Sequence, residues 1–383
     1  MPPLDLPPPS QDAQEVSQHL VQILRRSIDR ADGWISFERY MQMALYEPMV
    51  GYYSGGSRKF GAAGDFTTAP EITPLFGACL ATDIARWFEQ VPHRVLEFGG
   101  GSGVLAAQIL NELGRLGYQN VRYDMIELSS DLRVRQQQTL LTLAPQYANR
   151  VEWLEEMPRD VEGVVIANEL LDALPVSVFK ASGDHIFERG VVWSNDGESG
   201  FRWQDRPADP GLARRVRAKL TEFGWPNPDE WPQEYVSEYS PLVEAWVTTL
   251  AERIQKGVAL FFDYGFPARE YYHPQRAQGT LMCHYRHRAH TDPFFAPGLC
   301  DITAHVDFDL VAQAAALGGA EVLSYSNQAR FLIGCGMLDR LAKFDVNQQV
   351  MYAKQSQAVQ TLLNESEMGE LFKVIAIGRG VKA

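Results

Sequence analysis

The clearest guide to the fold is the segment Val95-Leu96-Glu97-Phe98-Gly99-Gly100-Gly101-Ser102-Gly103-Val104-Leu105. The residues up to Leu96 have the character of a short buried strand, and the apolar residues from Val104 onward recur at helical spacing. Alternate glycines join the two elements. Glycine permits a tight turn and lets a ligand approach the backbone closely. The helix then offers free N–H groups to a polar or anionic ligand. The stretch predicts a ligand-binding turn between a strand and a helix.

Two acidic residues make this turn more specific. Glu97 lies at the end of the first strand, and a second predicted strand, Arg122 to Ile126, is followed by Glu127. A carboxylate in the second position can accept hydrogen bonds from ribose hydroxyls. The pair favours a nucleotide-type ligand, and a purely structural turn in another doubly wound α/β protein is the alternative. The order of Glu97, Gly99, Gly101 and Gly103 resembles the first motif of class I S-adenosylmethionine-dependent methyltransferases.

Composition limits the other classes of function. The 383 residues are 45% hydrophobic, which is typical of a globular protein with a sizeable core. The net charge of -13 argues against nucleic acid as the main partner, because binding phosphates requires clustered Lys and Arg. The four cysteines form no Cys-x-x-Cys pair, which predicts a reducing, cytoplasmic location without disulfides or zinc. No stretch has the length and apolar character of a membrane span.

The chain divides into five predicted segments. Residues 11–30 have the pattern of an amphipathic helix, and Ser36 is placed to cap a second helix. Val178 to Trp193 has the pattern of a hairpin within an insertion. The segments are a disordered leader (1–14), an N-terminal helical extension with an active-site loop (15–90), the first half of the core (91–175), an inserted substrate-side lobe (176–256) and the second half of the core (257–383).

Two further stretches carry polar residues that secondary structure alone does not explain. Gly64-Asp65-Phe66-Thr67-Thr68-Ala69-Pro70-Glu71 precedes a helix that Thr73 and Pro74 are suited to begin. The strand 163–167 delivers Asn168, Glu169 and Asp172 to the carboxyl edge of the sheet, where open α/β sheets bind ligands. Asn168 by itself fits a helix cap, but that role leaves the two acids unexplained.

Several long motifs in the same order resemble the MidA family of class I methyltransferases, which includes a mitochondrial complex I assembly factor with protein arginine methyltransferase activity. The resemblance covers the chain from about residue 17 onward. The glycine turn departs from the family in Gly100, where relatives often carry proline. The other matching stretches are Gly64 to Ile72, Asn168 to Pro175, Phe262 to Gly265, Gly279 to Leu281, Asp301 to Phe308 and Met368 to Val374.

The resemblance implies an α/β, Rossmann-like fold with a seven-stranded, mostly parallel sheet whose last strand is antiparallel. It also implies S-adenosyl-L-methionine as the cofactor, with Glu97 near its amino group and Glu127 at its ribose. The residues expected to bind the cofactor are Gly64, Asp65, Thr68, Pro70, Glu71, Glu97, Gly99, Gly101, Gly103, Glu127, Leu128 and Asn168. The expected catalytic residues are Glu169, Asp172 and Asn168, because paired carboxylates hold a guanidinium through bidentate hydrogen bonds. Asp263 is a further candidate.

The resulting hypothesis is a protein arginine methyltransferase whose substrate, by the family resemblance, is a subunit of a complex I-type quinone reductase. A different protein or small-molecule acceptor, a non-catalytic assembly factor that binds the cofactor, and a nicotinamide dehydrogenase are the alternatives. His305 is expected to be either a packed histidine or a base. The basic run 284–290 matches no tetrahedral metal pattern, so no metal is expected. Of the tryptophans in the insertion, only Trp225 and Trp231 are candidates for binding the substrate.

Overall fold

The computed structural model describes residues 6–55, 68–194, 200–227, 229–345 and 347–382. Its main sheet has the strand order β15-β16-β10-β5-β2-β3-β4, with the two-residue strand β14 paired to β10. All neighbouring pairs from β4 to β10 are parallel, whereas β16 is antiparallel to both β10 and β15. The strands are β2 (Arg94–Phe98), β3 (Arg122–Ile126), β4 (Val151–Leu154), β5 (Val161–Asn168), β10 (Ile254–Phe266), β14 (Val306–Asp307), β15 (Glu321–Asn327) and β16 (Phe372–Arg379). The predicted α/β class with a mixed sheet is confirmed.

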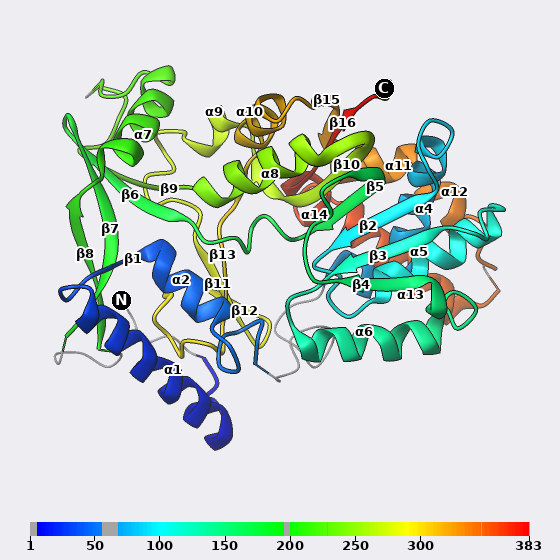
Figure 1. Cartoon of the computed structure of the whole chain (residues 1–383), viewed down its shortest axis with the longest axis horizontal. Helices are drawn as coiled ribbons and strands as arrows, with labels where there is room; N and C mark the ends of the chain where they lie inside the picture. Colours follow the sequence, from blue (N-terminus) through cyan, green and yellow to red (C-terminus); the bar gives the residue numbers. More distant parts are fainter. Residues whose placement is uncertain (1–5, 56–67, 195–199, 228, 346, 383) are drawn as a thin grey trace.

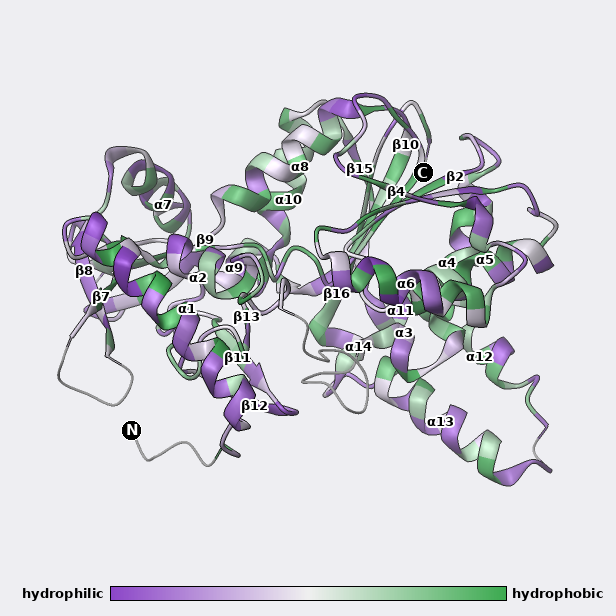
Figure 2. Ribbon diagram, turned by 60° about the horizontal axis from the view of Figure 1, so that its bottom comes forward, coloured by the Kyte–Doolittle hydropathy of each residue, from purple (hydrophilic) through white to green (hydrophobic). Residues whose placement is uncertain are grey.

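Helices cover both faces of this sheet, which explains why its strands are apolar without interruption. Val164 and Ile166 of β5 pack into one core with α4 and α5, while Val165 and Ala167 pack into another with α8 and α10. Figure 2 shows the apolar residues gathered in these strands. The helices are α3 (Ala69–Ile72), α4 (Pro74–Trp87), α5 (Val104–Arg115), α6 (Ser130–Leu143), η1 (Ala148–Arg150), α8 (Pro241–Arg253), α10 (Phe308–Leu317), α11 (Gln328–Gly334), α12 (Met337–Leu341), α13 (Gln349–Leu363) and α14 (Met368–Leu371).

A second lobe lies beside the main sheet (Figure 1). Its sheet has the order β1-β7-β6-β9, with β8 paired to β7, and a three-stranded sheet β12-β11-β13 lies near it. Because β1 pairs with β7, the N-terminal helices and the insertion share one hydrophobic core. The elements are α1 (Gln11–Arg30), β1 (Ile35–Ser36), α2 (Phe37–Tyr46), β6 (Ser177–Ser182), β7 (His185–Trp193), β8 (Phe201–Pro207), α7 (Pro210–Glu222), β9 (Glu234–Tyr239), α9 (Ala268–Tyr271), β11 (Met282–Tyr285), β12 (Arg288–His290) and β13 (Asp301–Thr303).

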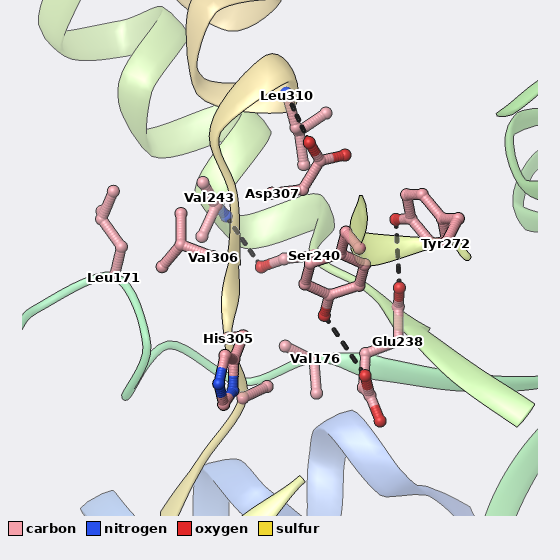
Figure 3. A pocket seen from close by; sticks show the side chains of 12 residues that line it. Leu171, Val176, Glu238, Ser240, Val243, Tyr272, His305, Val306, Asp307 and Leu310 are labelled. Atoms are coloured by element: carbon pink, nitrogen blue, oxygen red, sulfur yellow. Dashed lines mark hydrogen bonds between the residues drawn. The ribbon is translucent and has the colours of Figure 1, made fainter. Parts of the chain in front are cut away.

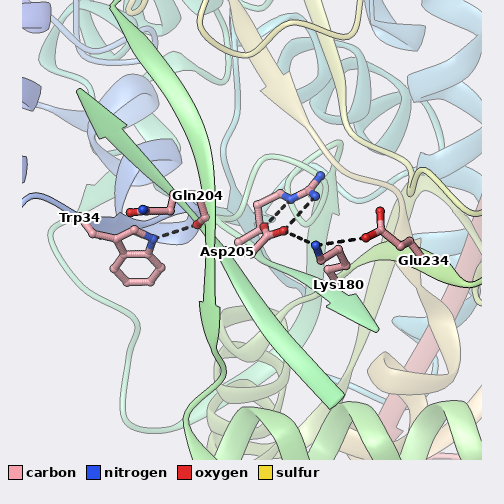
Figure 4. A network of polar contacts seen from close by, with 6 residues as sticks. Trp34, Lys180, Gln204, Asp205 and Glu234 are labelled. Atoms are coloured by element: carbon pink, nitrogen blue, oxygen red, sulfur yellow. Dashed lines mark hydrogen bonds and ion pairs between the residues drawn. The ribbon is translucent and has the colours of Figure 1, made fainter. Parts of the chain in front are cut away.

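Polar contacts across the strands stabilise the lobe sheet (Figure 4). Asp205 of β8 pairs with Lys180 of β6 at 2.8 Å and with Arg189 of β7 at 2.9 Å. The indole Nε1 of Trp34, just before β1, donates to the carbonyl oxygen of Gln204 at 2.9 Å. The ion pairs hold the strands of the insertion together, and the Trp34 contact holds the N-terminal segment to the insertion.

Local signals place the helix starts correctly. The hydroxyl oxygens of Ser36, Thr73 and Ser240 accept hydrogen bonds from backbone N–H groups at the starts of α2, α4 and α8. Helix α1 begins at Gln11, inside the segment predicted to be a disordered leader (1–14), because Ser10 caps it. Helix α8 packs on the main sheet although it lies within the predicted insertion (176–256). Within the described residues, no helix is long and apolar enough to cross a membrane.

Phe262 of β10 gives a direct test of the core. Its side chain is fully buried, and its ring lies 5.8 Å from that of Phe76 and 5.1 Å from that of Phe331. We expect Phe262→Ala to lower the free energy of unfolding by about 3–5 kcal/mol, because it leaves a cavity between two rings. Urea unfolding monitored by circular dichroism measures this change. Val350→Ala, at an 87% exposed residue, is expected to stay within about 0.5 kcal/mol, and equal effects of the two would contradict this core.

Candidate active site

A cavity of about 680 Å³ lies at the carboxyl edge of β2, β3 and β5 and is also lined by residues of the second lobe. Open α/β sheets bind ligands at this edge. The lining residues include Gln42, Tyr46, Tyr53, Thr68, Pro70, Glu97, Phe98, Gly99, Gly100, Gly101, Ser102, Glu127, Leu128, Met157, Asn168, Glu169, Leu170, Leu242, Trp246 and Arg253. The cavity therefore brings together most of the described residues that the sequence predicted as a site.

The glycine turn forms the floor between β2 and α5. Gly99, Gly101 and Gly103 have φ angles of 65°, 51° and 81°, in the left-handed region that favours glycine. A Cβ atom on Gly100 would lie 2.1 Å from Cε of Met125, and one on Gly103 would lie 2.9 Å from Cα of Gln136. The turn thus needs glycine both for its backbone conformation and for close packing against β3 and α6.

Glu97 is a buried acid on the wall of the cavity, with 2% of its surface exposed. Its Oε2 accepts a hydrogen bond from the hydroxyl of Tyr123 at 2.8 Å. Burial, together with the negative charge of Glu127, raises the pKa of Glu97 to about 7, against the opposing effect of the Tyr123 hydroxyl. A cationic group in the cavity would favour the ionised carboxylate.

Glu127 follows β3 and lines the same cavity. Its Oε1 accepts from the backbone N–H of Ser129 at 2.9 Å, and its Oε2 accepts from Nε2 of Gln136 at 3.0 Å. Burial raises the pKa of Glu127, and both hydrogen bonds oppose this by favouring the carboxylate. Glu97 and Glu127 thus face one shared space, as the two acids around the glycine turn predicted.

Asn168 is the last residue of β5 and Glu169 follows it, and both line the cavity next to the glycine turn. The Nδ2 of Asn168 donates to Oε1 of Glu169 at 3.1 Å, and the backbone N–H of Ala69 also hydrogen-bonds to this carboxylate. Glu169 has a φ of 53°, which is uncommon for a residue with a side chain. Burial raises the pKa of Glu169 to about 7, and the negative charge of Asp301 contributes to the increase.

Asp172 and Asp263 lie behind this wall and are not among the residues that line the cavity. Their carboxyl groups hydrogen-bond to each other, and Oδ2 of Asp263 also accepts from the backbone N–H of Leu171 at 2.8 Å. Burial raises the pKa of both groups, and a nearby negative charge adds to it, that of Glu169 for Asp172 and that of Asp172 for Asp263. The pair connects the segment after β5 with β10.

The segment before α4 approaches the glycine turn from outside the sheet. Thr68 and Pro70 line the cavity, and Glu71 accepts a hydrogen bond from the hydroxyl of Ser102 in the turn. The Nε2 of Gln108 in α5 donates to the carbonyl oxygen of Pro70 at 2.8 Å. Gly64 and Asp65, which the sequence also predicted as cofactor-binding residues, lie outside the described residues.

Residues of the second lobe also line the cavity, which the sequence alone did not predict. Tyr46 of α2 and Tyr53 line it with stacked rings whose centroids are 5.5 Å apart. Their hydroxyls donate to the carbonyl oxygen of Ala173 and to Oδ1 of Asp301, both at 2.9 Å. The only sequence signal for this wall is the run Gly51-Tyr52-Tyr53, which by itself predicts a loop.

His305 lies outside this cavity and is a packed residue. Its ring stacks on Phe266 with centroids 5.3 Å apart, beside a void of about 10 Å³ that Glu238 and Asp307 also line (Figure 3). Burial lowers the pKa of His305 to about 4. Trp225 and Trp231, the two candidates for recognition, are buried in the core of the second lobe.

The basic run 284–290 forms the hairpin between β11 and β12. Arg286 and His287 occupy its turn, where both have positive φ angles. Across the described ranges of the chain, no group of three His, Cys, Asp or Glu residues is arranged to hold a metal ion. The hairpin packs beside β13 in the second lobe, and it contributes no residue to the lining of the large cavity.

Known proteins that resemble this chain include methyltransferases, which agrees with a cavity suited to S-adenosylmethionine. Residues 79–326 match the model of a family described as "Putative S-adenosyl-L-methionine-dependent methyltransferase". A Burkholderia thailandensis protein described as a "likely methyl transferase", bound to S-adenosyl-homocysteine, is 46% identical over 99% of this chain and 96% of its own, with a TM-score of 0.93. A second crystal structure from that organism, of an uncharacterised protein, is 45% identical over 99% of this chain and 96% of its own, with a TM-score of 0.90.

Curated relatives extend over nearly the whole chain. The Drosophila melanogaster protein arginine methyltransferase NDUFAF7 homolog is 30% identical over 100% of this chain and 90% of its own length. The Homo sapiens protein arginine methyltransferase NDUFAF7 is 27% identical over 91% of this chain and 81% of its own. Both relatives are named mitochondrial, which overturns the cytoplasmic location predicted from the cysteines. Free cysteines indicate a reducing environment but do not distinguish between compartments that provide one.

Proposed function

The chain belongs to the MidA family of S-adenosylmethionine-dependent methyltransferases, and on this premise we propose that it methylates a guanidinium nitrogen of arginine in a protein. The observation that carries the proposal is the Glu169 carboxylate, which lines the cofactor cavity directly beside the glycine turn. The charged groups that raise the pKa of Glu169 and Asp172 are themselves carboxylates, Asp301 and Glu169 respectively. This concentration of acids suits a cationic acceptor. The names of the curated relatives support arginine as that acceptor.

S-adenosylmethionine, when bound, supplies a methyl group already activated by its sulfonium, so the protein has mainly to bind, orient and exclude water. Gly99 and Gly101, which line the cavity, would provide the backbone surface for the methionyl part, and Gly103, which does not line it, would allow the turn to pack closely on Gln136. Glu97 would accept hydrogen bonds from the ammonium, and Glu127 would accept them from the ribose hydroxyls. Leu128 would border the adenine side. The remaining predicted residues, Thr68, Pro70 and Glu71, would hold the glycine turn from outside.

On the acceptor side, Glu169 would pair with the guanidinium and take up the proton that the product nitrogen releases. Asn168 would orient this carboxylate through its hydrogen bond. Asp172, bonded to Asp263 behind the wall, would act as a positioning residue that keeps negative charge near Glu169. A bidentate contact with a carboxylate fixes the orientation of the planar guanidinium. A lysine ammonium is a compact point charge and has no plane that such a contact could fix.

The arrangement of the lobes is part of the proposal. We infer that the main sheet is the Rossmann-like sheet of class I methyltransferases, with β16 as its antiparallel strand, and that residues 91–175 and 257–383 form the two halves of its core. The second lobe would then be the substrate side, because Gln42, Tyr46 and Tyr53 line the cavity opposite the glycine turn.

Methyl transfer to candidate proteins tests this function. The full chain would be incubated with isotopically labelled S-adenosylmethionine and a protein extract, with a subunit of a complex I-type quinone reductase as the first purified candidate. Mass spectrometry is expected to find methylated arginine. Methyl groups found only on lysine or on small molecules would contradict the arginine assignment, and cofactor binding without any transfer would favour a non-catalytic assembly factor.

Cofactor affinity is expected to rise with pH. Because burial raises the pKa of Glu97 to about 7, this carboxyl is mostly protonated at pH 6 and mostly ionised at pH 8. Only the ionised form pairs with an ammonium, so S-adenosylhomocysteine should bind about tenfold more tightly at pH 8 than at pH 6. Calorimetry across this range measures the change. Tyr123→Phe removes the hydrogen bond that lowers this pKa and should shift the profile to higher pH, and an unchanged profile would argue against Glu97 as the titrating group.

A further inference from the structure

Helix α6 has a polar residue, Gln136, on its buried face, at a position where the helical spacing of its buried residues predicts an apolar side chain. Leu132, Gln136 and Leu140 lie four residues apart on its buried face. Gln136 is fully buried, with 0% of its surface exposed, whereas the next two residues, Gln137 and Gln138, are exposed. Burying an amide is costly unless its donors and acceptor are all bonded. The position of Gln136 therefore indicates a specific set of partners.

Three separate elements provide these partners. The indole Nε1 of Trp153 in β4 donates to Oε1 of Gln136 at 2.8 Å. The Nε2 of Gln136 donates to the carbonyl oxygen of Gly101 at 3.1 Å and to Oε2 of Glu127 at 3.0 Å. An indole N–H can only donate, so it fixes the amide oxygen on its own side. The amide nitrogen must then face the two acceptors, and both of its protons are used.

These bonds fix the carboxylate of Glu127. Its Oε1 accepts from the backbone N–H of Ser129 and its Oε2 accepts from Gln136, and the backbone N–H of Leu128 also hydrogen-bonds to this carboxylate. The two oxygens of a carboxylate together accept about four hydrogen bonds, so accepting capacity is left for a ligand. Glu127 lines the cavity, so this remaining capacity is available to ligand hydroxyls.

We propose that Gln136 is a positioning residue that sets the selectivity of this site for a ribose with both hydroxyls, by locking the Glu127 carboxylate to the carbonyl of Gly101. The proposal rests on the assignment of Glu127 to the ribose made above. It adds that the ribose-binding acid and the glycine turn act as one unit, because a single amide bonds to both.

The test compares S-adenosylhomocysteine with its 2′,3′-dideoxyribose analogue by calorimetry on the full chain. The wild-type chain is expected to prefer the natural ligand by about 100-fold, as expected for two hydrogen bonds to a carboxylate. Gln136→Met keeps the length of the side chain but removes its polar atoms. It should reduce this preference to about tenfold or less, mainly by weakening binding of the natural ligand. A preference equal to that of the wild type would overturn the proposal.

Two further variants keep the result interpretable. Gln137→Met makes the same change at the exposed neighbour on α6 and should retain the wild-type preference. Trp153→Phe removes the indole donor that orients the amide and should reduce the preference by about threefold, so it tests the same link if Gln136→Met does not fold. If the wild type itself binds both ligands equally, the ribose assignment of Glu127 fails, whereas a variant that keeps the wild-type preference refutes only the role of Gln136.

Discussion

Replacing Gly101 with valine is expected to abolish cofactor binding, with a loss of affinity for S-adenosylhomocysteine of about 100-fold or more. Gly101 lines the cavity with a φ of 51°, a conformation that a β-branched residue adopts only under strain. The new side chain would also occupy space that the ligand needs at the backbone. In addition, a shift of the Gly101 backbone would disturb the carbonyl oxygen that accepts from Gln136.

A valine substitution at a second glycine shows whether backbone strain alone, without any change at the cavity, lowers cofactor affinity. Gly183 lies in the turn between β6 and β7, has a nearly identical φ of 53°, and has nothing within 4 Å of the place where a Cβ would stand. Gly183→Val therefore introduces similar backbone strain far from the cavity, and we expect wild-type affinity. Calorimetry on both variants measures the difference. Tight binding by a folded Gly101→Val protein would show that this turn does not cradle the cofactor.

Glu169→Gln should lower kcat for methyl transfer by about 100-fold or more while affinity for S-adenosylhomocysteine changes less than about threefold. The substitution preserves shape but removes the charge that would face the acceptor guanidinium. The assay uses labelled S-adenosylmethionine with the protein substrate found by mass spectrometry. Glu162→Gln, at an exposed residue of β5, the strand that precedes Glu169, is the matched control and should keep wild-type activity.

The outcome of this comparison assigns the residue to one side of the cavity. Unchanged kcat in Glu169→Gln would contradict the proposed role at the acceptor. A large loss of affinity for S-adenosylhomocysteine would instead place Glu169 among the groups that bind the cofactor. The two readouts are independent because product binding does not require an acceptor.

Long-range contacts explain what the sequence analysis did not foresee. Tyr46 and Tyr53 are held at the cavity by residues far along the chain, because their hydroxyls bond to Ala173 and Asp301 and β1 pairs with β7. Asp172 carried the same expectation as Glu169, yet it bonds to Asp263 behind the cavity wall. Residues three positions apart beyond a strand end can point to opposite sides, and the turn between them decides which one reaches the ligand.

The amino-acid sequence alone was enough to predict the glycine turn, the strands and helices on either side of it, the helix caps and the family. Each of these depends on residues within a few positions, such as the glycines that permit positive φ angles or the hydroxyls that accept from nearby N–H groups. The three-dimensional fold was needed to learn which acids line the cavity, that a buried glutamine joins Glu127 to the glycine turn, and that the second lobe supplies another part of the wall. These contacts join elements far apart in the chain, so no local pattern in the sequence encodes them.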